Sequence, residues 1–273
     1  MPLIVVPTPI GNLDDMTIRG VEELKNADLI VCEDTRRTLK LLNHYGIKKP
    51  LLACHRHNER ERTGEIVSRL EGGARVALVS DAGTPCVSDP GCELIGAAIE
   101  RGIELDVLPG ANAPLPALIL SGLPARQFTF IGFLGDNKKK RAREAKELSQ
   151  LQSTLIFYAA PHDLKETLRF LSASLGNRDA AIVREISKIH QETIRGTLAE
   201  LEEIAASREI KGEIVLVVRG AEAVEPMPHD WREEAGQMRA SGSPDREIAD
   251  AMSEKYGAKR NEVKRWLRRA DKI

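Results

Sequence analysis

The chain has 273 residues, of which 42% are hydrophobic and 30% are charged, and its formal net charge is −1. This composition is ordinary for a soluble globular protein, and the length suits two compact domains with a small appendage. No apolar run approaches the ~20 residues that cross a bilayer, and the N-terminus lacks the basic region of a signal peptide, so we expect a cytoplasmic protein without a membrane partner. The four cysteines occur singly, which favours neither a disulfide framework nor a metal site.

The first half of the chain alternates short β-branched runs with helical segments. Runs of this kind occupy residues 3–6, 28–34, 50–55, 75–80 and 103–109. Strands that alternate with helices predict a mainly parallel sheet covered on both faces. We expect an N-terminal α/β domain over residues 1–120.

The second half predicts a different sheet. Its strand-like runs occupy residues 128–134, 153–160, 179–187, 192–197 and 212–220. Two of them are separated by only a short turn, which favours an antiparallel hairpin. The fold class is therefore α/β, with a second α/β domain of mixed sheet over residues 121–224.

The C-terminal segment is helical and basic. After a proline-containing linker at 222–230, Ser243 and Pro244 indicate a helix start, and a second helix follows Gly257. We expect a helix-turn-helix-like module over residues 229–273. Residues 259–273 alone carry a charge of +5, which leaves −6 for the rest, and a second basic cluster, KKKRAR, lies at 138–143. Such clusters favour a polyanionic partner, although a solvated helix face explains either one equally well.

Several common motifs are missing. The sequence contains no G-x-G-x-x-G after a strand, no Gly-Lys pair of a P-loop and no H-E-x-x-H or G-x-S-x-G. Instead, loops rich in Gly, Pro and Asp follow the first, fourth and fifth predicted strands, at residues 7–12, 81–91 and 109–114. Ligands of open α/β sheets bind beyond the carboxyl ends of the strands, so these loops predict a pocket.

Two aspartates of the 81–91 loop invite different interpretations. Asp89 precedes Pro90 at the start of a helical pattern, and helix capping is the favoured interpretation. Asp81 directly follows the buried strand, where a carboxylate is costly unless it binds something polar. We therefore expect Asp81, Gly83 and Thr84 to bind a ligand.

The segments CEDTRRT (32–38), VALVSDAGTPCVSDPG (76–91), LPGANAPLPALILSGLP (108–124) and REISKIHQE (184–192) together resemble the class III, tetrapyrrole-methylase-type S-adenosylmethionine methyltransferases. The resemblance covers nearly the whole chain in order. It is greatest to the members of that family that methylate ribosomal RNA. It implies S-adenosylmethionine bound between two domains, a homodimer, and methylation of the ribose 2′-hydroxyl of a decoding-region cytidine in the 16S rRNA of the small ribosomal subunit, with no role for DNA.

By this resemblance, cofactor-binding residues come from both domains. They are Pro9, Gly11, Asp81, Gly83, Thr84, Pro85, Ala111, Asn112, Ala113, Phe133, Leu134, Gly212 and Glu213.

A ribose hydroxyl is a poor nucleophile, so a base or a stabilising cation would help the reaction. Arg184, Glu185 and Lys188 flank a predicted strand end and are the candidate catalytic residues. Lys188 could act as a base only if desolvation lowered its pKa. The competing interpretation is an ion pair between Arg184 and Glu185, with Lys188 on phosphate.

Candidate RNA-binding residues lie in four segments. They are Glu33, Asp34, Arg36, Arg56, Lys138, Lys139, Lys140, Arg141, Lys264, Arg265 and Arg268. Helix capping is an equal alternative for Asp34, and we expect the loop around His55 and His57 to be mobile and to face RNA rather than to supply an acid and a base.

Two other functions remain open at this point. A related enzyme could methylate a tetrapyrrole or a modified protein side chain, although the basic C-terminal helices argue against it. A non-enzymatic RNA-binding protein on the same scaffold would not bind S-adenosylmethionine.

Overall fold

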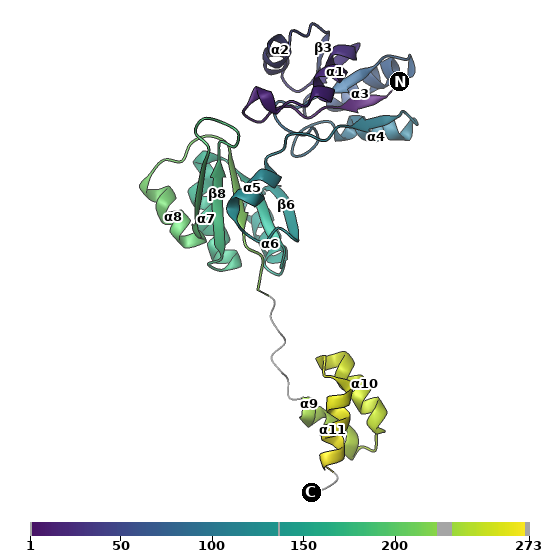
Figure 1. Ribbon diagram of the computed structural model, residues 1–273, viewed down its shortest axis with the longest axis vertical. Coiled ribbons are helices and arrows are strands. Elements are labelled where there is room, and N and C mark those ends of the chain that lie inside the picture. The colour runs from purple at the N-terminus through teal and green to yellow at the C-terminus, as the bar shows by residue number, and fades with distance from the viewer. Residues whose placement is uncertain (1, 136, 223–230, 271–273) are drawn as a thin grey trace. The chain divides into compact units, whose positions relative to one another are not determined.

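A computed structural model describes residues 2–135, 137–222 and 231–270, without the side chains of residues 138, 269 and 270. The chain forms two compact units, Met1–Ala221 and Glu222–Ile273. The first unit contains two five-stranded sheets, and the second contains helices only in its described part (Figure 1). The prediction of two α/β sheets followed by a helical module is confirmed.

The first sheet is parallel throughout. Its strands are β1 (Leu3–Val5), β2 (Leu29–Cys32), β3 (Leu51–Ala53), β4 (Val76–Leu78) and β5 (Leu105–Val107), in the order β3-β2-β4-β1-β5. All five predicted strands are present, each shorter at its ends than its hydrophobic run. Because β4, β1 and β5 are neighbours, the three loops that follow them start from adjacent positions on one sheet edge.

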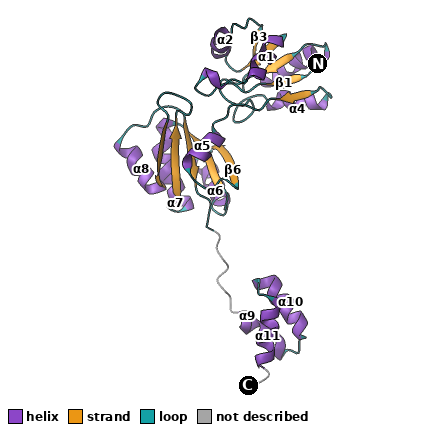
Figure 2. Ribbon diagram, viewed as in Figure 1, coloured by secondary structure: helices purple, strands orange, loops and turns teal. Residues whose placement is uncertain are grey.

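Helices cover both faces of this sheet (Figure 2). The elements on one face are η1 (Leu13–Asp15), α1 (Ile18–Asn26) and α2 (Thr35–His44), and those on the other are α3 (Glu59–Glu71) and α4 (Cys92–Glu100). Alternate residues of β1 pack against the helices on opposite faces of the sheet. Leu3 packs with Ile66 and Leu94, whereas Ile4 packs with Leu24. Burial on both faces explains why the inner strands β1, β2 and β4 are apolar throughout.

The second sheet is mixed. Its strands are β6 (Phe128–Phe133), β7 (Thr154–Ala159), β8 (Asp179–Arg184), β9 (Glu192–Thr197) and β10 (Ile214–Val218), in the order β6-β7-β10-β8-β9. Only β6 and β7 pair in parallel, and β8 with β9 forms the antiparallel pair that the short turn predicts.

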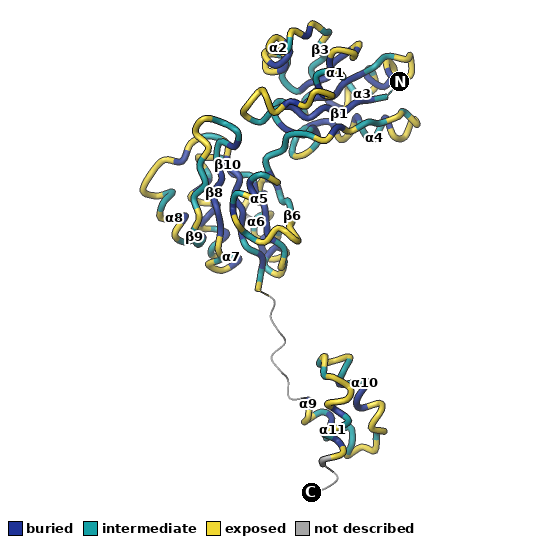
Figure 3. Tube along the Cα trace, viewed as in Figure 1, coloured by how far each residue is buried: buried dark blue, intermediate teal, exposed yellow. Residues whose placement is uncertain are grey.

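The covering helices of this sheet are also divided between its faces. They are α5 (Pro114–Ser121) on one face and α6 (Lys138–Leu148), α7 (Leu164–Leu175) and α8 (Leu198–Ser207) on the other, with the short η2 (Pro161–Asp163) after β7. Phe157 is fully buried under α7 and α8, while its neighbour Ile156 packs against α5. The period of two along the strand thus separates the two cores, which appear as dark, buried strands in Figure 3.

The C-terminal unit is a small helical cluster. It consists of α9 (Trp231–Ala240), α10 (Asp245–Tyr256) and α11 (Arg260–Ala270), packed around Trp231, Ile248, Met252, Val263 and Leu267. The turn at Gly257, with φ +66°, matches the prediction. The predicted helix start is off by one position, because Pro244 is extended and caps a helix that begins at Asp245. Most of the predicted linker, residues 223–230, lies outside the described residues.

The start of α4 corrects one expectation. Asp89 does not cap this helix, because the helix begins only at Cys92, after Gly91 with φ +124°. The N–H groups of Gly91 and Glu93 instead donate to Glu59 Oε1, each at 2.9 Å. A buried carboxylate from α3 therefore accepts hydrogen bonds from the first amides of α4. Its negative charge also interacts favourably with the positive end of the helix dipole.

We expect Glu59→Ala to lower the free energy of unfolding of the first unit by about 1–3 kcal/mol, because the buried amide of Gly91 and the partly buried amide of Glu93 lose a charged acceptor. Both tryptophans of the chain, Trp231 and Trp266, lie in the C-terminal unit. Urea unfolding followed by far-UV circular dichroism should therefore shift, while the tryptophan fluorescence transition stays in place. Glu61→Ala, an exposed residue of the same helical turn, is the control. Equal effects of the two substitutions would contradict the capping role.

Candidate functional site

Hydrogen bonds join the three loops at the edge of the first sheet. The backbones of Thr8 and Gly83 exchange two hydrogen bonds, of 2.9 and 2.8 Å, which connect the loops after β1 and β4. The Thr84 hydroxyl donates to the carbonyl of Ala111 at 3.0 Å, which connects the loops after β4 and β5. Gly83 has φ +85°, a conformation that a side chain rarely adopts. The loops thus form one ordered wall.

The second sheet supplies the opposite wall. Its pairing places the end of β7, the start of β10 and the end of β8 side by side, since Ile214 is opposite both Ala159 and Arg184. On the neighbouring strand β6, Phe133 is paired with Tyr158. A Cβ atom on Gly11 would lie only 2.6 Å from Lys188 Cγ, so this glycine allows the first wall to approach the segment after β8.

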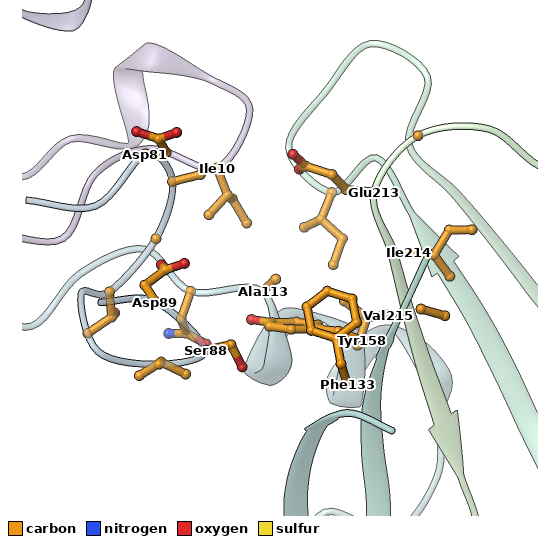
Figure 4. Close-up of a pocket in the computed structure, with 18 of the residues that line it drawn as sticks. Ile10, Asp81, Ser88, Asp89, Ala113, Phe133, Tyr158, Glu213, Ile214 and Val215 are labelled. Carbon is orange, nitrogen blue, oxygen red and sulfur yellow. The ribbon is translucent and has the colours of Figure 1, made fainter. Parts of the chain in front are cut away.

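A pocket of about 420 Å³ lies between the two walls. Figure 4 shows Ile10, Asp81 and Asp89 on the wall from the first sheet, facing Tyr158, Phe133, Glu213 and Ile214. The described residues that line the pocket include many small or apolar ones and four carboxylates: Ile10, Glu33, Arg37, Asp81, Ala82, Gly83, Thr84, Val87, Ser88, Asp89, Asn112, Ala113, Phe133, Tyr158, Ala159, Ala160, Pro161, Ile186, Gly212, Glu213, Ile214 and Val215.

Asp81 is held by the segment that follows β2. Its Oδ1 accepts a hydrogen bond of 3.0 Å from the Asp34 N–H, and its Oδ2 lies 3.4 Å from Arg37 Nε. These contacts orient the carboxylate, which has lone pairs left for a ligand. Asp34 itself caps α2, and hydrogen bonds from Arg36 lower its pKa to about 2.

The surroundings of Asp89 and Glu33 disfavour the charged forms of these two carboxylates. Burial, followed by the negative charges of Glu33 and Asp81, raises the pKa of Asp89 to about 6. Burial and the charge of Asp81 also raise the pKa of Glu33. Across the pocket, burial and the charges of Asp89 and Glu213 raise the pKa of Tyr158 to about 12, so this phenol keeps its proton. The four carboxylates of the pocket are only partly compensated by positive charge from Arg37. Together with the apolar lining, this favours a cationic ligand with apolar parts.

None of the three predicted catalytic residues is among the described residues that line the pocket, but Lys188 and Glu185 contact the lining residue Glu213. Lys188 Nζ donates to Glu185 Oε1 at 2.9 Å and to Glu213 Oε2 at 3.1 Å. Burial lowers the pKa of Lys188, but these two hydrogen bonds outweigh it, and the pKa is raised. The condition for a lysine base is therefore not met, and Lys188 is a protonated cation.

Arg184 and Glu185 do not form the ion pair that the alternative interpretation expected. The Arg184 guanidinium donates to the carbonyls of Lys211 and His190, and it lies 3.6 Å from Glu192. Glu185 has φ +52° and accepts the Glu213 N–H. Arg184 thus braces the segments around β8, while Glu185 holds Lys188 and the start of β10.

The predicted cofactor residues divide into two groups. Asp81, Gly83, Thr84, Asn112, Ala113, Phe133, Gly212 and Glu213 line the pocket, whereas Pro9, Gly11, Pro85, Ala111 and Leu134 do not. Each of the second group lies next to a lining residue in sequence or holds one. Leu134, for example, follows the lining residue Phe133, and its own side chain packs against the core of the second sheet.

The predicted RNA-binding residues are not gathered at one place. Glu33 lines the pocket, and Asp34 with Arg36 forms a pair at the start of α2. Lys139 and Lys140 are exposed on α6, while Arg141 donates to the Gly135 carbonyl; the side chain of Lys138 lies outside those described. On α11, Arg265 and Arg268 are exposed and Lys264 is half-buried.

The segment 55–59 has a structural role that the sequence interpretation missed. Asn58 Oδ1 accepts the His55 N–H at 2.7 Å, and Asn58 Nδ2 donates to the Ala53 carbonyl. Arg56 donates to the carbonyl of Ser88, and Glu59 holds Gly91. Hydrogen bonds from this segment thus hold the residues on both sides of Asp89, and the mobility of the segment stays a prediction.

Sequence reasoning also missed several lining residues. Arg37, Asp89, Tyr158 and Val215 come from α2, the 81–91 loop, β7 and β10. A signal existed for Tyr158, since a polar ring at the end of a buried strand resembles the position of Asp81. No local signal identifies Val215, because only the antiparallel pairing brings the start of β10 to this edge.

Comparison with known proteins agrees with this architecture. The family model of the tetrapyrrole (corrin/porphyrin) methylases matches residues 2–202. A protein of Halalkalibacterium halodurans named ribosomal RNA small subunit methyltransferase I is 48% identical over 230 residues, which cover 84% of this chain and 80% of that protein. A protein of the same name from Haemophilus influenzae is 39% identical over 268 residues, covering 95% of this chain and 93% of that protein.

Solved structures show the same fold. Diphthine synthase superposes with a TM-score of 0.63 at 16% identity, over 81% of this chain and 90% of that one. Uroporphyrin-III C-methyltransferase from Thermus thermophilus, in complex with S-adenosylhomocysteine, gives a TM-score of 0.57 at 17% identity, over 80% of this chain and 97% of that one.

The chain belongs to the tetrapyrrole methylase family of S-adenosylmethionine-dependent methyltransferases and, within it, to the group of proteins named ribosomal RNA small subunit methyltransferase I. The fold class and the cofactor that the sequence resemblance implied are therefore confirmed.

We expect Asp89→Asn to raise the free energy of unfolding by about 1–2 kcal/mol at pH 7.5. The folded-state pKa of about 6 exceeds the usual aspartate value, so folding is opposed by the ionised group and favoured as the pH falls through 6. The gain should therefore shrink between pH 7 and pH 4 in urea titrations.

Asp34→Asn is the control of opposite sign. The pKa of Asp34 is lowered by Arg36, so its charge stabilises the fold at neutral pH and this contribution is lost only as the pH falls toward 2. Asp34→Asn should destabilise the protein at pH 7.5. A destabilised Asp89→Asn variant at that pH would contradict the electrostatic account of the pocket.

Proposed function

We propose that this protein transfers the methyl group of S-adenosylmethionine to the ribose 2′-hydroxyl of a decoding-region cytidine in the 16S rRNA of the small ribosomal subunit. The observation that carries the proposal is its 39–48% identity, over most of the chain, to proteins named ribosomal RNA small subunit methyltransferase I. The acidic pocket and the basic C-terminal helix support it independently.

The residues of the pocket fit the methyl donor. S-adenosylmethionine carries a sulfonium and an ammonium cation together with a flat adenine, and the pocket combines four carboxylates with apolar side chains. Small residues, namely Gly83, Ala113 and Ala159, leave room close to the backbone. Asp81, Thr84 and Ala113 on the first wall, with Glu213 and Val215 on the second, would hold the donor.

When bound, the donor supplies an electrophilic methyl group on a positively charged sulfur. The protein's own contribution is mainly to hold the reactants in line in a cleft with little water, which lowers the entropic cost of the reaction. Lys188, a cation paired with the lining residue Glu213, is placed to attract a phosphate or to stabilise developing negative charge on the acceptor oxygen.

The C-terminal unit supplies the positive charge that an RNA substrate requires. The helix α11 buries Val263 and Leu267 in the core of the unit, while Arg265 and Arg268 remain exposed. Few aromatic residues, 4% of the chain, are available for base stacking, so phosphate contacts and shape should position the RNA. Recognition by phosphate contacts and shape suits a folded ribonucleoprotein as the substrate.

We further propose that the protein acts in the cytoplasm as a homodimer and without DNA as a partner. Exposed apolar residues on α5, Leu115 and Ile119, offer surface for a second copy. No helix in the described part of the chain is long and apolar enough to cross a membrane.

We expect Asp81→Ala to weaken S-adenosylmethionine binding by about 100-fold or more, because the charged acceptor that Asp34 and Arg37 orient is lost. Isothermal titration calorimetry measures the affinity, and far-UV circular dichroism checks the fold. Glu100→Ala, which removes an exposed carboxylate at the other end of α4, should bind the donor normally. Wild-type affinity in Asp81→Ala would refute the site.

The function itself is tested with small subunits from a strain that lacks the protein. Wild-type protein with labelled donor should methylate one cytidine at its 2′-oxygen, and the triple variant Lys264→Ala, Arg265→Ala, Arg268→Ala should do so with a KM for subunits raised about 10-fold or more, because phosphate contacts are lost. Removal of three exposed lysines elsewhere, Lys25, Lys48 and Lys165, is the matched control. Methylation of uroporphyrinogen instead of subunits would overturn the proposal.

A further inference from the structure

The four carboxylates of the pocket differ in their contacts with the rest of the protein. Asp81 is committed to the Asp34 N–H and to Arg37. Glu213 is paired with Lys188, and its side chain is 67% exposed. Each of these two carboxylates is therefore already engaged by a hydrogen-bond donor or a cation of the protein itself. Asp89 and Glu33 remain.

Asp89 is the better placed of these two. It lies on the 81–91 loop with its carboxylate directed into the pocket, opposite Tyr158 (Figure 4). The residues before it are held in an unusual conformation, with φ +71° at Cys86 and +68° at Ser88. Strained backbone of this kind persists where surrounding contacts enforce it, and it is common at functional sites.

Contacts from α3 and the segment before it enforce that conformation. Arg56 donates to the carbonyl of Ser88, on one side of Asp89, and Glu59 accepts the N–H of Gly91 on the other. Ser88 is also close to Gly132 of β6, where an added Cβ would lie 3.0 Å from its hydroxyl oxygen. The carboxylate is therefore held at a defined position on the pocket wall rather than on a free loop.

We propose that Asp89 is the general base of the methyl transfer, accepting the proton of the substrate hydroxyl. This inference rests on the proposed function. The oxygen–carbon bond forms as the sulfur–carbon bond breaks, the sulfur retains the electron pair of that bond, and the hydroxyl proton passes to an Asp89 carboxylate oxygen. The products are the methyl ether, neutral S-adenosylhomocysteine and neutral Asp89, so charge and atoms balance.

The charges around Asp89 suit this role. It faces carboxylates at the end of β2 and on its own loop, a guanidinium before α3 and a phenol on β7: Glu33, Asp81, Arg56 and Tyr158. Burial and the two carboxylates raise its pKa to about 6, which is near the optimum for a base at neutral pH. A bound sulfonium cation favours the ionised form, and the loss of that charge during transfer favours the protonated form at the moment when the proton arrives.

The rate test compares three variants on small subunits with saturating donor. Asp89→Asn should lower kcat by about 10²–10⁴-fold and abolish the acidic limb of the pH profile, while Asp89→Glu recovers part of the rate. Glu33→Gln should keep the acidic limb but move it to lower pH, since removal of a neighbouring negative charge lowers the pKa of Asp89. The affinity of Asp89→Asn for S-adenosylhomocysteine, which carries no sulfonium charge, should match that of the wild type.

A second readout needs no RNA. Calorimetric titration of the wild type with S-adenosylmethionine at pH 6, in two buffers of different ionisation enthalpy, should show release of a fraction of a proton per donor bound. Titration with S-adenosylhomocysteine should release less, and Asp89→Asn should release fewer protons than the wild type with S-adenosylmethionine, since only the share of Glu33 remains.

The outcomes separate the two proposals. A wild-type protein that does not methylate small subunits overturns the proposed function. An active wild type with an Asp89→Asn variant that retains its rate or its acidic limb overturns the assignment of the base alone. Donor binding to the wild type without proton release at pH 6 overturns that assignment as well.

Discussion

The structure depends on one constraint of parallel sheets, namely that neighbouring strands deliver their following loops to the same edge. β4, β1 and β5 are adjacent, so three loops separated by up to about a hundred residues meet and are joined by the Thr8–Gly83 and Thr84–Ala111 hydrogen bonds. The second sheet uses antiparallel pairing to present strand ends of both directions to these loops. The pocket exists only because the two edges face each other.

The electrostatics of that pocket oppose folding and serve function at once. Asp89 and Glu33 are carboxylates whose burial is only partly compensated, so each weakens the fold at neutral pH. The same deficit of positive charge attracts a cationic donor and prepares a carboxylate to accept a proton. The hydrogen bonds that Arg56 and Glu59 make with the 81–91 loop offset this cost, because they fix the loop from outside the pocket.

Much of the fold could be predicted from the sequence, because the cue for each strand is local. Runs such as residues 75–80 are apolar on both faces, and their following loops carry glycines and aspartates whose chemistry points to a ligand. Asp81 and Gly83 were found in this way. The resemblance to known methyltransferases contributed the cofactor and the residues of the second wall.

What could not be predicted depends on contacts between distant segments. Asp89 followed by Pro90 has every local feature of a helix cap, yet Glu59, thirty residues earlier, takes that role and leaves Asp89 in the pocket. Lys188 likewise required knowledge of its partners, because two carboxylates reverse the effect of burial on its pKa. The positions of Tyr158 and Val215 follow from strand pairing, which no local pattern records.

The central claim is that the donor binds between these two edges. A crystal structure of the protein soaked with S-adenosylhomocysteine tests it most directly. The account expects density for the ligand between the wall of Asp81 and Asp89 and the wall of Tyr158 and Val215. Density for the ligand at any other place on the molecule, with this pocket empty, would contradict it.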